Sequence, residues 1–216
     1  MKKLFLLLFI FIPMHLLGQE RLGTWKIEDV KVPPLQQRST NPLKITPYTV
    51  KMKAGTVIER MGIGSDCKFH QVFTISGGRD EANGVVKDYI KEELKKYNFL
   101  TTDLNVDLVL SPIVTDSRIN SCYKDNSLTE ALGEAYVQVK WVLRSQKNGI
   151  IVFDTTTAGY YSNSMYVKTN TKEANLFTMA VLVSVRRLMT NEDFRLISSL
   201  LQKENVHEEE VEEIKV

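Results

Sequence analysis

The segment FHQVFTISGGRDEANGVVKDYIKEELKKYNFLTTDLNVDLVLSPIVTDS, residues 69–117, decides the fold because three patterns succeed one another in it. Apolar and polar residues alternate over 69–76, which is typical of a strand. Over 79–97 the apolar residues return at helical spacing, and Asn98 suits the left-handed position that ends a helix. The mostly apolar run 106–110 predicts an inner strand. We therefore expect strand, helix, strand, joined by a right-handed crossover if the strands are parallel.

A hairpin is predicted after this segment. Residues 137–143 alternate, with Trp141 on the apolar side, and Asn148-Gly149 is a strong short-range hairpin signal. Residues 150–161 then form the return strand.

Two more helices are predicted towards the end of the chain. Asn170 and Glu173 have capping-box spacing before a long helix, and another helix follows Asn191. Two long connections are expected, 117–133, which ends in a helical signature, and 159–171. The predicted fold class is α+β, a mixed sheet in the order β-α-β-β-β-α-α with the helices packed on one face.

The first residues read as a secretory signal peptide. Two lysines precede nine apolar residues, 4–12, and Gly18 offers a small residue for cleavage. The apolar stretch 4–17 is shorter than the ~20 residues that a spanning helix needs. We expect residues 1–18 to be removed, no transmembrane helix after cleavage, and a periplasmic or secreted protein.

Three further segments are expected after the signal peptide. Residues 19–64 form an extended, proline-containing arm with possible edge strands, 65–203 a single α/β domain, and 204–216 an acidic tail. The signal contains two of the 28 basic residues, so the 26 that remain equal the 26 acidic ones. This balance and the absence of a basic cluster argue against nucleic acid as a partner.

The two cysteines, Cys67 and Cys122, both fall in predicted loops. In an exported protein such a pair is most simply a disulfide. Two alternatives stay open. One is nucleophilic catalysis by Cys67 with His70. The other is a metal site formed by Cys67, His70 and Cys122, with Asp66 as a fourth ligand. No metal site is predicted.

Other chemical signals are sparse. Asp66 and Asp80 flank the first strand and are the carboxylate pair that a hydrolase could use. No cofactor is predicted, because Gly62 and Gly64 lack the third glycine of a dinucleotide loop. Tyrosines are favoured at interfaces, so we expect the binding residues in the loop 159–171 to be Tyr160, Tyr161 and Tyr166.

The succession of elements resembles a known kind of domain. The residues that carry the resemblance are the helix end Lys-Lys-Tyr-Asn-Phe (95–99) and the strands Val-Asp-Leu-Val-Leu (106–110), Val-x-Val-x-Trp (137–141) and Gly-Ile-Ile-Val-Phe-Asp (149–154). Together with a signal peptide and a final helix, they resemble the small α/β domain of bacterial envelope proteins of the YajG and TolB amino-terminal type. The resemblance covers about 69–189.

These observations lead to two hypotheses about function. The first is an exported, non-enzymatic cell-envelope protein that acts as a binding or assembly module. Its partner would be an envelope protein, a glycan or a membrane component. The alternative is a secreted hydrolase that uses Cys67 and His70, or a carboxylate pair.

Overall fold

A computed structural model gives the fold of this chain and describes residues 30–35, 43–64, 67–74, 84–100, 108–171 and 175–199. The predicted signal peptide and acidic tail therefore lie outside the described residues. The elements are β1 (Leu43–Ile45), β2 (Thr49–Val50), β3 (Val57–Ile63), β4 (Lys68–Thr74), α1 (Gly84–Lys96), β5 (Leu108–Tyr123), β6 (Glu130–Ser145), β7 (Ile151–Lys168) and α2 (Leu176–Thr190). Residues 192–199 form a further helical segment.

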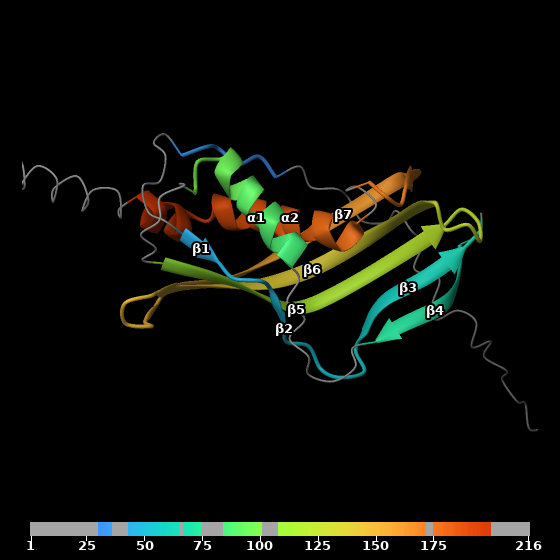
Figure 1. Ribbon diagram of the computed structural model, residues 1–216, viewed down its shortest axis with the longest axis horizontal. Coiled ribbons are helices and arrows are strands. Elements are labelled where there is room, and N and C mark those ends of the chain that lie inside the picture. The colour runs from blue at the N-terminus through green and yellow to red at the C-terminus, as the bar shows by residue number, and fades with distance from the viewer. Residues whose placement is uncertain are drawn as a thin grey trace, which may run out of the picture.

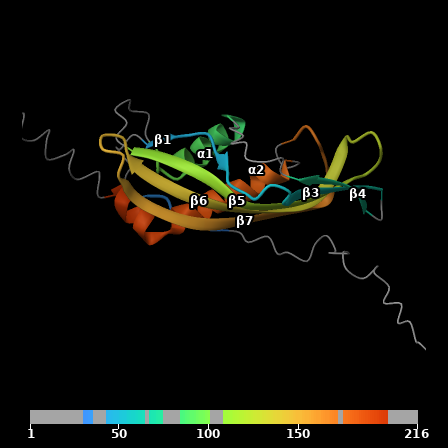
Figure 2. The ribbon, with the colours of Figure 1, turned by 90° about the horizontal axis from the view of Figure 1, so that it is seen from below.

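The strands form one mixed sheet in the order β4-β3-β5-β6-β7. β5, β6 and β7 are long and antiparallel, whereas β1, β2 and β3 pair in parallel with successive parts of one edge of β5. Figure 1 shows α1 and α2 on the same side of this sheet, and Figure 2 shows the sheet from its other side. The predicted α+β class, with its mixed sheet and helices on one face, is confirmed.

The predicted order of elements holds from β4 onward, but β4 and β5 do not form a parallel pair. β4 is antiparallel to β3, and β3 is parallel to β5, so β4 and β5 run in opposite directions. β3 also lies between them in the sheet. The connection through α1 is therefore not a crossover between parallel neighbours. Edge strands are the only strands expected in the arm 19–64, but β3 of this arm is an inner strand.

α1 forms where the helical spacing predicts it. Its buried residues Val86, Ile90 and Leu94 recur every four positions, so they lie on one face of the helix. Lys95 and Lys96 occupy the last turn, where cations interact favourably with the helix dipole. The chain then leaves the helix through Asn98, whose φ of 65° is left-handed, as expected.

The predicted long connection 117–133 is wrong. β5 continues to Tyr123 and β6 starts at Glu130, so strands occupy most of this range. The polar residues that suggest a loop are paired inside the sheet instead; Ser121 Oγ, for example, donates to Glu59 Oε1 at 3.0 Å. Ser127, in the expected helical signature, donates to Asp125 in the short turn between the strands.

The second expected loop, 159–171, is mostly strand as well, because β7 continues to Lys168. As a result α2 starts later than the capping-box spacing predicts. Its N-cap is Asn175, whose Oδ1 accepts from Thr178 N at 3.0 Å, and not Asn170. Glu173 lies outside the described residues. The last helix is capped as expected, since Asn191 Oδ1 accepts from Phe194 N at 3.0 Å.

The core lies between the sheet and the helices, and the hairpin β6–β7 contributes much of it. The hairpin is confirmed, and Trp141 of β6 is fully buried. α2 packs closely on β7 at Gly159, where an added Cβ would meet Ala180 O of the helix. Among the described residues, no helix combines the length and apolar character needed to cross a membrane.

Candidate functional site

The two cysteines are joined. Cys67 and Cys122 form a disulfide whose Cα atoms are 5.5 Å apart, which confirms the prediction. The bridge fastens the turn between β3 and β4 to the end of β5. Because both thiols are used, neither cysteine of the oxidised chain is a nucleophile or a thiolate ligand.

Of the other candidate catalytic residues, the structure describes only His70. His70 is an exposed residue of the short strand β4. Asp66 and Asp80 lie outside the described residues. In the part of the chain that the structure describes, no His, Cys, Asp or Glu residues gather in a group that could hold a metal ion.

The three predicted binding tyrosines belong to β7 and not to a loop. Tyr160 is buried, whereas Tyr161 and Tyr166 are half-buried. Successive residues of a strand point to opposite faces, so Tyr160 and Tyr161 cannot contact one ligand together. Tyr161 packs against the core on the helix side. Tyr160 lines a pocket on the other side.

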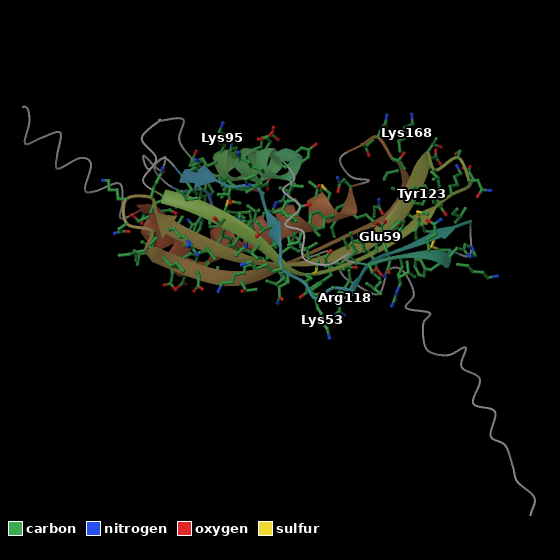
Figure 3. The ribbon with its side chains drawn as sticks, turned by 60° about the horizontal axis from the view of Figure 1, so that its bottom comes forward. Lys53, Glu59, Lys95, Arg118, Tyr123 and Lys168 are labelled. Atoms are coloured by element: carbon green, nitrogen blue, oxygen red, sulfur yellow. A yellow bond between two sulfur atoms is a disulfide. The ribbon has the colours of Figure 1, made fainter. Side chains whose placement is uncertain are left out.

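This pocket, which we call the Glu134 pocket, lies on the face of the sheet without helices. It has a volume of about 220 Å³ and is lined by Val57, Ile58, Arg60, Arg118, Ile119, Asn120, Glu134, Tyr136 and Tyr160. Gly133 and Gly159 lie against α2, so the next residues, Glu134 and Tyr160, point away from the helices. Figure 3 labels Arg118 on the side of the sheet opposite α1.

Strand register gathers these residues from four strands. Arg60 of β3 is opposite Asn120 of β5, which is opposite Glu134 of β6. In the adjacent row, Arg118, Tyr136 and Tyr160 face one another across β5, β6 and β7. Directly opposed residues of a sheet share a face. Two neighbouring cross-strand rows therefore build the pocket on rigid backbone.

A buried hydrogen-bond network forms the inner part of the pocket. The Glu134 side chain accepts from Asn120 Nδ2 at Oε1 and from the Tyr160 hydroxyl at Oε2, both at 2.9 Å. Glu134 is only 3% exposed and Tyr160 8%. Each carboxylate oxygen has a second lone pair, so both can accept one more donor. The three side chains thus satisfy one another within the protein, and the Glu134 carboxylate can still accept hydrogen bonds from a ligand.

The charges of the pocket are unevenly placed. Burial, followed by the hydrogen bond to Glu134, raises the pKa of Tyr160 above its usual value, so the phenol stays a donor at neutral pH. Arg60 and Arg118 bring two positive charges to the lining, against the one negative charge of Glu134. Arg118 Nη2 lies 3.3 Å from Asp116 Oδ2 in an exposed ion pair.

Sequence reasoning identified Tyr160 but not its partners in the pocket. The sequence predicts a loop at Arg118 and Asn120, whereas both residues belong to β5. Extending the β6 pattern back from Val137 places Glu134 and Tyr136 on the face opposite Trp141. The β5 pattern cannot be extended in this way, because a bulge between Val114 and Asp116 reverses the alternation of the strand.

A second cavity of about 290 Å³ lies on the helix-covered face, near the start of α2. Most of its polar groups serve the fold, but Asn163 Nδ2 is buried there without a hydrogen-bond partner. Ser121 donates to Glu59, Asn175 caps α2, and Asn163 Oδ1 accepts from the backbone N–H of Gly133. The Glu134 pocket is the better candidate for a binding site, because a carboxylate that is only 3% exposed lines it.

No family model matches this chain, and no curated protein matches it. Solved structures are similar to it at low sequence identity. One is a protein from Xanthomonas campestris described under the family model DUF330, with 12% identity, a TM-score of 0.42, and coverage of 84% of this chain and 98% of that one. Another is a PelC dodecamer from Paraburkholderia phytofirmans, with 14% identity, a TM-score of 0.35, and coverage of 74% and 96%. These likenesses carry no inference about activity or partners.

Proposed function

We propose that this chain is an exported, non-enzymatic protein of the bacterial cell envelope, and that it acts as a binding module through the Glu134 pocket. The basic and apolar residues of 1–18 support export. The disulfide between Cys67 and Cys122 also supports an oxidising compartment, because such bonds persist outside the cytoplasm. The resemblance to envelope proteins of the YajG and TolB amino-terminal type is a prediction from the sequence, and it agrees with a location in the cell envelope.

The observation that carries the proposal is the buried carboxylate of Glu134 at a pocket. Removing a carboxylate from water costs several kcal/mol, and a well-packed apolar residue would often be at least as stable in its place. A charge retained at the bottom of a cavity therefore indicates a use beyond packing. Its two protein donors, Asn120 and Tyr160, fix the carboxylate in place for a further donor.

Two tyrosine substitutions on the full exported chain test the proposal. The oxidised protein is immobilised and exposed to detergent-solubilised envelope from the native host, and the retained components are eluted and quantified by mass spectrometry. Tyr136→Ser alters the pocket wall, whereas Tyr166→Ser makes the same chemical change on β7 outside the pocket. We expect Tyr136→Ser to reduce the retained component at least about tenfold, as loss of an interface anchor does.

Tyr166→Ser should retain the component, and both variants should keep the circular dichroism spectrum of the wild type. Equal retention by the wild type and Tyr136→Ser would contradict binding at the Glu134 pocket. Loss on Tyr166→Ser alone would place binding at the end of β7 instead.

A further inference from the structure

The Glu134 pocket combines three kinds of group that one ligand could use together. Arg60 and Arg118 provide guanidinium donors on β3 and β5, and Glu134 provides acceptors on β6. Tyr136, half-buried and opposite Arg118, provides an aromatic wall between them. The amide of Asn120 must present its nitrogen to Glu134, because a carboxylate only accepts. Its Oδ1 is thus a further acceptor.

We infer that the ligand of this pocket is an acidic saccharide, bound through one hexuronate residue. The inference rests on the proposed binding function and names its ligand class. The sugar carboxylate would pair with Arg118 and Arg60, since guanidinium groups suit carboxylates geometrically. The sugar hydroxyls would donate to Glu134 and Asn120, and the ring would lie against Tyr136.

The size and charge of the pocket favour this ligand over others. At about 220 Å³ it is smaller than the 300–1,000 Å³ typical of sites for drug-sized molecules, so it suits a single ring. The lining carries Arg60, Arg118 and Glu134, and Asp116 lies beside Arg118, so the exposed fork of the Arg118 guanidinium and not a net charge favours an anionic group. A neutral sugar offers no carboxylate to the fork of the Arg118 guanidinium, and an acidic peptide donates to Glu134 only through backbone N–H groups.

Asp116 does not block the pairing with Arg118. Their contact is an exposed ion pair, and the Arg118 side chain is 66% exposed. Exposed ion pairs contribute little to stability, so a ligand carboxylate can replace Asp116 as the partner of the guanidinium.

Calorimetric titration of the full, oxidised chain tests the ligand class. The probes are trisaccharides of galacturonate, glucuronate and mannuronate, each paired with its carboxyl-reduced, neutral counterpart. We expect at least one acidic trisaccharide to bind about tenfold or more tightly than its neutral counterpart. Arg118→Gln should weaken that binding at least tenfold and bring the acidic and neutral probes close together.

Arg144→Gln is the matched control. Arg144 is exposed on the same strand and face as Glu134 but outside the pocket, so its loss should leave the affinity unchanged. Equal affinity for acidic and neutral probes, or equal losses from Arg118→Gln and Arg144→Gln, would overturn the inference. So would tighter, Arg118-dependent binding of inorganic phosphate or of a tetraglutamate peptide.

Failure of this inference is distinguishable from failure of the proposed function. If no acidic trisaccharide binds while Tyr136→Ser still abolishes retention of an envelope component, the ligand class is wrong and the binding function stands. If Tyr136→Ser has no effect on retention, the pocket itself is not the binding site, and both proposals fail.

Discussion

Replacement of Trp141 by alanine should be among the most damaging single changes in the described part of the chain. The Trp141 ring is fully buried, and its Nε1–H donates to Thr157 Oγ1 at 2.8 Å. Thr157 in turn donates to Ser184 O of α2 at 2.9 Å, so the tryptophan also supports the contact between sheet and helix. Truncating a buried tryptophan typically costs ~3–5 kcal/mol, a large part of the 5–15 kcal/mol of a stable domain.

Urea denaturation of oxidised protein measures this cost. With an m value of about 2 kcal/mol/M, the midpoint for Trp141→Ala should fall by ~1.5–2.5 M. Trp141→Phe retains most of the ring, so its loss should be smaller and include ~1 kcal/mol for the hydrogen bond. Arg144→Ala, exposed on the other face of β6, should change the free energy of unfolding by less than ~0.5 kcal/mol. Equal midpoint shifts for Trp141→Ala and Arg144→Ala would refute the assignment of the two faces.

Three further predictions concern other parts of the fold. Thiol titration of denatured, unreduced protein should find no free thiol. Replacing Cys67 and Cys122 by serine should lower the free energy of unfolding by ~4 kcal/mol, since the bridge spans 55 residues. Unchanged stability would mean that the disulfide is not formed. The fold raises the pKa of Tyr160, so the contribution of the neutral phenol to stability is complete below about pH 10 and is lost as the pH rises further. The free energy of unfolding of Tyr160→Phe should therefore fall less than that of the wild type from pH 10 to 12. Parallel losses would contradict the burial of the Tyr160 phenol. Gly159→Ala places a methyl group against the backbone of α2 and should lower the melting temperature by several degrees more than Gly149→Ala, which meets open space and suffers only from its positive φ.

The elements with regular apolar spacing could be predicted from the sequence. Val86, Ile90 and Leu94 recur as a helix face, and Asn148-Gly149 joins two alternating strands; all are found as expected. The disulfide could also be predicted, since export and a pair of cysteines leave few options.

The second half of β5 could not be predicted as easily, because its buried residues are polar. Ser117, Asn120 and Ser121 are each less than 10% exposed, although such residues usually occur in loops. Partners on other strands compensate for their burial, namely Glu134 for Asn120 and Glu59 for Ser121. These partners are distant in sequence, so no local pattern reveals them.

The candidate site could not be predicted from the sequence for the same reason. Its carboxylate and phenol, Glu134 and Tyr160, are 26 residues apart and meet only because the β6–β7 register places them on one face. The sequence drew attention to Tyr160 as one of three loop tyrosines. The continuation of β7 instead directs it into a pocket and separates it from Tyr161.

Hydroxyl-radical footprinting in the presence of solubilised native envelope tests the central claim, binding at the Glu134 pocket, most directly. The method reports which side chains of the wild-type protein lose solvent exposure on binding. We expect oxidation of Tyr136 to fall, while oxidation of Met165, which is 75% exposed on β7, and of Phe73, which is 45% exposed on β4, stays constant. Protection of Met165 or Phe73 with no change at Tyr136 would contradict the account and place the interface at an edge of the sheet.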